Sequence, residues 1–499
     1  MAGADFSHVR DAPSVVVSAA VATSGGHAYC DVRGSISPRT HFDIKLPTSG
    51  WRGQYLQEGC DGGVFCGAVA LPARPLAGFT CQPAVDGQLV LATDDGGHTA
   101  SDQTDGRWAK NDPHLRQVFG LTSEHSLKQL AKAVITRYYG RPPAYSYFDG
   151  CSTGGRQGLI LAQRYPTDFD GIIAGAPAGN LAPLAGMLDP WLIQHNTDRA
   201  GHQILTAEKL AALHAAVIGQ CGDAHGIIAD PRRCTFQPAS IQCPPGTDTA
   251  PCLTTAQVSA VRAFYRGPTD TAGGSLYNGG VPYGSELGWA TFVAPAADTG
   301  APADTYDARI ALNYLKYLGY AHNPPDRFTL AGVRFTDREL ARLNVLGNAI
   351  YNANNPDLTA FRAHGGKLLI YHGLADPAIP PWSTIDYYAA VEHATGGFAA
   401  SQRFSRLYLV PGAYHCLVGP DFNHPAEIAT PELLTPMIAW VERGVAPQAV
   451  PAPIIALPDY ATVIKQTIAP YDALAPAPAA ATSLNGNYDY HGHYPPRPS

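Results

Sequence analysis

The chain has 499 residues, 45% of them hydrophobic, which is enough to bury a large core and to divide into more than one domain. Its net charge is −7 at pH 7, and we find no basic patch of the kind that binds nucleic acid, so we expect no nucleic-acid partner. No apolar run reaches the length of about 18 residues that a membrane span needs, so we expect no membrane partner either.

Ten cysteines, an even number with several close-spaced pairs, indicate an oxidising compartment. We therefore expect a secreted or periplasmic protein. The first residues, from Met1 to Phe6, lack the basic and apolar regions of a signal peptide, as in a mature sequence that was given a start methionine.

The first part of the chain contains segments typical of core strands, followed by a helix. The strands are expected at residues 42–46, 54–57 and 88–92, and the helix at 124–139. The second strand leads into a glycine-rich loop that contains Gly62 and Gly63. Cys60 and Cys66 flank this loop and can close it with a disulfide.

The segment around Ser152 has the pattern of a strained turn between a strand and a helix. Residues 144–148 suit a buried strand, residues 156–165 suit a helix, and Gly150 to Gly154 between them matches G-x-S-x-G. This pattern predicts Ser152 as a nucleophile. The backbone N–H of Thr153, together with that of Gly62 or Gly63, is the expected oxyanion hole; for the glycine loop a plain turn is the alternative.

A long insertion is expected after the next core strand, at residues 171–177. The following core strand is not recognisable before Lys367, and the interval is too long for a loop, so we predict an inserted lid domain at residues 180–365. Cys221 and Cys234, and likewise Cys243 and Cys252, are close in sequence and expected to pair, although four cysteines allow three connectivities.

Asp376 and His415 follow two later strand candidates, at residues 367–373 and 407–410. The carboxyl ends of parallel strands gather at one edge of a sheet, and the order Ser, Asp, His is that of a hydrolase triad. We therefore predict Asp376 to orient His415 as the general base for Ser152. Taken singly, Asp376 could be a turn residue and His415 an ordinary histidine.

Each of the two central residues of this triad has a cysteine beside it, Cys151 next to Ser152 and Cys416 next to His415. If the serine and the histidine meet, these cysteines come within the roughly 7 Å that a disulfide can bridge. The predicted catalysis and the predicted disulfide then each require the same two segments to meet.

This combination of Cys-Ser, Asp and His-Cys resembles the tannase and feruloyl esterase family, over roughly residues 30–475. The resemblance implies an α/β-hydrolase core with a large inserted lid domain, the roles given above for Ser152, Asp376 and His415, and a Cys151–Cys416 bridge. It also supports pairing of the lid cysteines, and pairing of Cys30 with Cys81, which spacing alone supports less well.

The resemblance also raises the question of a metal, because members of the family often have a calcium loop after the first lid cysteine. Here the loop after Cys221 is short and contains two carboxylates, Asp223 and Asp230. Ca²⁺ prefers six to eight oxygen ligands. We therefore predict no required cofactor and no metal, with calcium in the lid as a less favoured alternative.

The predicted organisation has a first core part at residues 1–179, the lid at 180–365, a second core part at 366–475 and a flexible tail at 476–499. For the substrate pocket we select Ile379 and Trp382, which follow Asp376, and the lid residue Trp289. Further lid candidates are aromatic residues for a planar ring and arginines for a carboxylate: Trp191, Tyr306, Tyr314, Phe335, Arg327, Arg334 and Arg338.

The expected function is hydrolysis of small-molecule esters of phenolic acids, of the feruloyl-esterase or tannase type, through an acyl-enzyme. Two alternatives remain open. One is a hydrolase of terephthalate monoesters, which the same family contains. The other is a binding protein that has kept an inert hydrolase fold.

Overall fold

The computed structural model describes residues 1, 3–60, 65–71, 76–78, 80–298, 300, 304–422 and 424–473. Gly62 and Gly63 and the predicted tail at 476–499 lie outside these residues. Within them, no helix is both long and apolar enough to cross a membrane.

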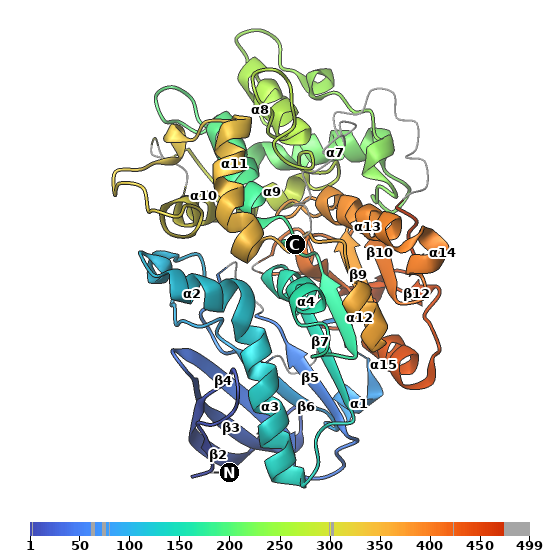
Figure 1. Cartoon of the computed structure of the whole chain (residues 1–499). Helices are drawn as coiled ribbons and strands as arrows, with labels where there is room; N and C mark the ends of the chain where they lie inside the picture. The colour runs from blue at the N-terminus through green and yellow to red at the C-terminus, as the bar shows by residue number, and fades with distance from the viewer. Residues whose placement is uncertain are drawn as a thin grey trace.

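A ten-stranded sheet forms the base of the molecule, in the order β1-β2-β3-β4-β6-β5-β7-β8-β9-β10 (Figure 1). Four strands at one end pair antiparallel: β1 (Asp5–Phe6), β2 (Ser14–Ser24), β3 (His27–Ile36) and β4 (Thr40–Pro47). The remaining strands run parallel to one another: β5 (Gln54–Glu58), β6 (Val90–Asp94), β7 (Tyr145–Cys151), β8 (Gly171–Gly175), β9 (Lys367–Gly373) and β10 (Ser405–Val410). The α/β class predicted from the sequence is confirmed.

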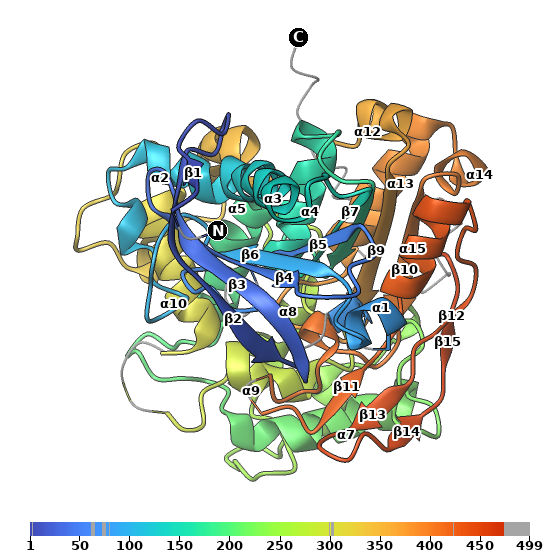
Figure 2. The same ribbon diagram turned by 90° about the horizontal axis from the view of Figure 1, so that it is seen from below.

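Helices cover both faces of the parallel part, because its strands are apolar on both sides. One face carries α3 (Ser123–Tyr139), α4 (Thr153–Arg164), α12 (Thr359–His364) and α13 (Trp382–Thr395). The other carries α1 (Gln82–Val85) and α15 (Leu434–Arg443). Figure 2 shows α3 and α4 on one side of the sheet and α1 on the other. Neighbouring side chains alternate between these layers, so Phe148 packs under α4 and Tyr147 packs toward α15.

Between β8 and β9 the described residues form helices and short turns that add no strand to the sheet. This insertion sits at one end of the sheet, coloured green to yellow in Figure 1, and has its own apolar core. Its α-helices are α5 (Leu181–Pro183), α6 (Asp189–His195), α7 (Leu210–Cys221), α8 (Thr255–Arg266), α9 (Trp289–Phe292), α10 (Tyr306–Asn313) and α11 (Asp337–Leu346).

Shorter elements complete the chain. Among them are α2 (Pro113–Gln117), the π-helices η3 (Val118–Thr122) and η4 (Leu184–Leu188), α14 (Phe398–Ser401), the 3-10 turn η12 (His415–Leu417), and five short strands, β11 (Glu427–Ala429), β12 (Val450–Pro451), β13 (Ile454–Ala456), β14 (Thr462–Ile464) and β15 (Thr467–Ile468). The five short strands form two small sheets after the last core strand.

Four of the five expected disulfides are present: Cys60–Cys66, Cys151–Cys416, Cys221–Cys234 and Cys243–Cys252. The predicted Cys30–Cys81 bridge is wrong, because both cysteines are free thiols. Cys30 packs with α3 on one face of the sheet, whereas Cys81 packs with α15 on the opposite face. The sheet itself separates the two sulfurs, and burial raises the pKa of the Cys81 thiol to about 11.

Candidate active site

Ser152 lies on a sharp turn between β7 and α4, as the sequence pattern predicted. Its backbone has φ 62° and ψ −117°, a conformation that L-residues rarely adopt. Close packing of glycine backbones makes the turn possible, because a Cβ atom on Gly155 would lie 2.2 Å from the carbonyl oxygen of Gly175. The turn places Ser152 at the N-terminus of α4, where the N–H groups of a helix point toward developing negative charge.

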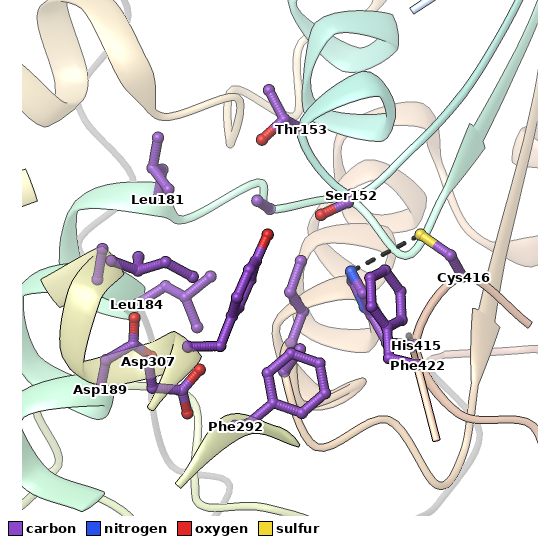
Figure 3. A pocket seen from close by; sticks show the side chains of 16 residues that line it. Ser152, Thr153, Leu181, Leu184, Asp189, Phe292, Asp307, His415, Cys416 and Phe422 are labelled. Atoms are coloured by element: carbon purple, nitrogen blue, oxygen red, sulfur yellow. Dashed lines mark hydrogen bonds between the residues drawn. The ribbon is translucent and has the colours of Figure 1, made fainter. Parts of the chain in front are cut away.

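Asp376 and His415 lie beyond the carboxyl ends of β9 and β10, at the same edge of the sheet as Ser152. Nδ1 of His415 donates a hydrogen bond to Oδ2 of Asp376 at 2.8 Å, and both side chains are buried. This bond places the proton of the neutral imidazole on Nδ1, which leaves Nε2 as an acceptor. Figure 3 shows Ser152 and His415 on the same side of one pocket.

The carboxylate of Asp376 is held by more than His415. Its Oδ1 accepts hydrogen bonds from the backbone N–H groups of Ala378 at 2.9 Å and Ile379 at 3.0 Å. Nε2 of the buried His372 lies 3.3 Å from Oδ2 and donates to the carbonyl oxygen of Ile379. Burial by itself raises the pKa of Asp376, but His415 and His372 outweigh it and hold that pKa well below its usual range. The carboxylate therefore stays ionised.

The Cys151–Cys416 disulfide joins the two segments that carry Ser152 and His415, across a sequence separation of 265 residues. Cys416 and Leu417 both adopt positive φ, 50° and 68°, which turns the chain sharply after His415. Sγ of Cys416 lies 3.7 Å from Nε2 of His415 (Figure 3). The bridge thus fixes the histidine ring at the serine turn.

Thr153 is the first residue of α4 and lines the same pocket as Ser152. The other predicted oxyanion donors, Gly62 and Gly63, lie outside the described residues. The chain just before them is close to the turn, because the carbonyl oxygen of Cys60 would lie 3.3 Å from a Cβ atom on Gly154. Oε1 of Gln157 in α4 accepts the N–H of Cys60 at 2.9 Å, which holds the start of this loop against the helix.

The pocket lies between the sheet edge and the insertion, and encloses about 580 Å³ of empty space including its mouth. Its apolar wall consists of Ala178, Leu181, Leu184, Ala185, Ile310, Ala378 and Ile379. Three aromatic side chains also line it, and they stand close together: the ring centroids of Phe292 and Tyr306 are 5.7 Å apart, and those of Phe292 and Phe422 are 6.0 Å apart. The centroid of Phe422 lies 5.6 Å from that of His415.

The pocket residues selected from the sequence are only partly found here. Ile379 and Tyr306 line the pocket, but Trp382 and Trp289 do not. Both tryptophans are fully buried, and their indole N–H groups donate to the carbonyl oxygen of Gly280 and to Oγ of Ser285 respectively. They are core residues, because their rings are buried and their N–H groups have partners inside the protein.

The remaining lid candidates are not part of the pocket wall. Trp191, Tyr314, Phe335 and the arginines Arg327, Arg334 and Arg338 do not line the pocket. Sequence reasoning missed Phe292, Phe422, Asp189, Asp307 and the second histidine, His372. Only Asp189 had a local signal, as an acid within an otherwise apolar run from Leu181 to Ile193.

In the loop after Cys221, the two carboxylates considered as calcium ligands form hydrogen bonds within the protein. Oδ1 of Asp223 accepts the backbone N–H groups of His225 and Ile227, and the carboxylate of Asp230 pairs with Arg232 at 2.9 Å. Both carboxylates therefore already have partners. Among the described residues, no group of three or more His, Cys, Asp or Glu side chains is placed to hold a metal.

Comparison with known proteins extends over nearly the whole chain. The family described as "Tannase and feruloyl esterase" matches residues 22–475. The mono(2-hydroxyethyl) terephthalate hydrolase of Piscinibacter sakaiensis is 32% identical, over 93% of this chain and 84% of that protein. A probable feruloyl esterase of Arthroderma benhamiae is 31% identical, over 82% of this chain and 74% of that protein.

Solved structures agree on the fold. Feruloyl esterase B from Aspergillus oryzae superposes with a TM-score of 0.76 at 23% identity, covering 95% of this chain and 96% of that one. Tannin acyl hydrolase from Aspergillus niger superposes with a TM-score of 0.71 at 21% identity, covering 94% and 90%. The fold is therefore the expected α/β-hydrolase core with a large insertion, and the chain belongs to the tannase and feruloyl esterase family of carboxylic ester hydrolases.

Proposed function

We propose that this protein is a serine esterase that hydrolyses esters of aromatic acids, with Ser152 as nucleophile, His415 as general base and Asp376 as its orienting carboxylate. The observation that carries the proposal is the 2.8 Å bond between His415 and Asp376, at a pocket that the strained Ser152 also lines. This arrangement supplies a nucleophile, a base in the required tautomer and a fixed negative charge behind the base.

The reaction follows from these positions. Nε2 of His415 takes the proton of Ser152 as the serine oxygen attacks the ester carbonyl, and the imidazolium that forms is stabilised by Asp376. Backbone N–H groups at the start of α4, with Thr153 first, receive the oxyanion; one such donor is typically worth about 3 kcal/mol of barrier. His415 then gives the proton to the leaving alcohol, and water repeats the sequence to release the acid.

The aromatic class of substrate is supported by the walls of the pocket. Phe292, Tyr306 and Phe422 form an aromatic cluster beside His415, and aliphatic side chains line much of the remaining surface. Such a wall buries a planar ring favourably, and rings prefer edge-on or offset contacts at these spacings. The feruloyl esterases among the relatives support esters of phenolic acids as the first choice.

A second candidate is hydrolysis of a terephthalate monoester. It is favoured by the similarity to the mono(2-hydroxyethyl) terephthalate hydrolase, which extends over 93% of this chain. The two candidates share the chemistry at Ser152 and differ in the group at the far end of the ring, which is a phenol in one and a carboxylate in the other.

The test begins with covalent labelling of Ser152 by a fluorophosphonate, located by mass spectrometry. The proposal predicts an adduct in the native protein and none in Ser152→Ala, whereas Ser126→Ala, at a half-buried serine on α3 that does not line the pocket, keeps it. Absence of an adduct in correctly folded protein would support an inert, hydrolase-fold binding protein.

Turnover of methyl ferulate, methyl gallate and mono-(2-hydroxyethyl) terephthalate then separates the substrate classes. The same panel with a chelator tests the predicted independence from calcium.

We also propose that the protein works in a secreted or periplasmic setting. Four disulfides support an oxidising compartment, since such bonds are rare where thiols are kept reduced. Alkylation of protein isolated from its native source tests this, with eight of the ten cysteines expected to be protected until a reductant is added.

A further inference from the structure

Two acidic side chains stand in the pocket, on a different wall from the proposed triad. Asp189 is the first residue of α6, and Asp307 lies in the first turn of α10, which packs against α6. Their exposed fractions are 4% and 3%, and both line the cavity that Ser152 and His415 line. In Figure 3 the two carboxyl groups lie on one side of the pocket, and Ser152 and His415 lie on the other.

Within the described part of the chain, no backbone or side-chain group donates a hydrogen bond to Asp189 or Asp307, and neither forms an ion pair with a cation. Lysine and arginine are absent from the described lining of the pocket. Polar groups this deeply buried are almost always hydrogen-bonded, because leaving them without a partner costs free energy. Because both carboxyl groups face the cavity and receive no donor from the described protein, they are available to a ligand that brings one.

Electrostatics define which donor fits. Burial raises the pKa of Asp189 well above its usual range. Burial also raises the pKa of Asp307, and the nearby Asp189 and Asp376 raise it further. Because a charge on Asp189 disfavours a charge on Asp307, the two carboxyl groups are not readily ionised together. The pair then offers both a donor and an acceptor to a neutral hydroxyl group, and repels a further negative charge.

We propose that Asp189 and Asp307 together recognise a phenolic hydroxyl group on the substrate ring and exclude rings that carry a carboxylate at that end. This inference rests on the proposed function, because it requires that an aromatic ester occupy the pocket with its carbonyl at Ser152. It selects phenolic esters over terephthalate monoesters and names the residues responsible. The alternative is that both acids only stabilise the N-termini of α6 and α10, which predicts effects on stability but none on selectivity.

A matched set of four methyl cinnamates tests the proposal, with hydroxyl, hydrogen, methoxy or carboxylate in the para position. The readout is kcat/KM for each ester divided by that for the unsubstituted one, after correction for their rates of alkaline hydrolysis. In the native protein we expect kcat/KM for the hydroxyl ester to exceed that for the unsubstituted ester by at least about tenfold, as for other hydrogen bonds to charged groups. The carboxylate ester should fall below the unsubstituted one.

The variants are Asp189→Asn, Asp307→Asn and the double variant, which keep the shape of the side chains and remove their ionisation. In each variant, the ratio of kcat/KM for the hydroxyl ester to that for the unsubstituted ester should fall to less than about 3. The double variant should also hydrolyse the carboxylate ester with a higher kcat/KM than the native protein does. Asp304→Asn is the matched control, because Asp304 lies just before α10 with its side chain 83% exposed and pairs with Arg309. It should keep the native ratios.

Three results would overturn the inference. One is a native protein with no hydroxyl preference, which needs no variant to observe. Another is a preference that survives in the folded double variant, and the third is a native preference for the carboxylate ester. Labelling of Ser152 and turnover of unsubstituted methyl cinnamate separate this failure from failure of the proposed function: if both persist while the ratios contradict the inference, only the inference is lost.

Discussion

Replacing Asp376 by asparagine tests the proposed role of this carboxylate most directly. Oδ1 of Asp376 accepts two backbone N–H groups, so the amide oxygen of an asparagine must take that place. The amide NH₂ then occupies the position of Oδ2, facing Nδ1 of His415, which now donates at 2.8 Å. To pair with an NH₂ group, Nδ1 must give up its proton, which moves the proton to Nε2. A protonated Nε2 cannot take the proton of Ser152.

The expected effect is a fall in kcat by a factor of about 10³–10⁴, as for the same change in other serine hydrolase triads. This corresponds to about 4–5.5 kcal/mol of transition-state stabilisation. The change should fall mainly on kcat, because Asp376 is fully buried and does not line the pocket. Fluorophosphonate labelling of Ser152 should slow by a similar factor.

Steady-state hydrolysis of methyl ferulate measures this change, alongside the Tm of each variant. Asp386→Asn is the matched control, because Asp386 is a half-buried aspartate on α13 whose carboxylate accepts a hydrogen bond from the side chain of Asn278. The control should leave kcat within about threefold of the native value. A folded Asp376→Asn variant that keeps more than a tenth of the native kcat would refute the role assigned to Asp376.

Other perturbations test the supports of the site. Replacing Cys151 and Cys416 by alanine removes a disulfide that spans 265 residues, so the free energy of unfolding in urea titrations should fall by about 4–5 kcal/mol. The kcat should fall as well, and unchanged values would contradict the role of the disulfide in positioning His415. Gly155→Ala should prevent folding of the serine turn and lower Tm sharply, whereas Gly219→Ala, at an open helical position, should stabilise by about 0.5–1 kcal/mol. Burial raises the pKa of Asp386 from 3.8 to about 7, so ionisation of this carboxyl group destabilises the fold as pH rises. Relative to the native protein, Asp386→Asn should therefore become progressively more stable between pH 4 and pH 8, by up to about 4 kcal/mol. A stability difference that does not change with pH would refute this.

Much of this architecture can be predicted from local features of the sequence. Apolar periodicity locates the core strands and the helices beside Ser152, and the serine turn follows from glycines that permit close backbone approach. Asp376 and His415 could be selected because each follows a strand, and parallel strands end at one edge. The bridges within the insertion follow from short spacing, since the structure joins Cys221 to Cys234 and Cys243 to Cys252.

Contacts between distant segments required the tertiary structure. The sequence could not reveal that Cys30 and Cys81 lie on opposite faces of the sheet, because that depends on which face each segment packs against. Nor could it separate Trp289 and Trp382, which are core, from Phe422, which lines the pocket, since all are apolar and near the site. Asp189 and Asp307 are more than a hundred residues apart from one another in the chain and meet only because α6 packs against α10. Periodicity and turn chemistry act over a few residues, whereas a pocket is made by side chains that folding brings together.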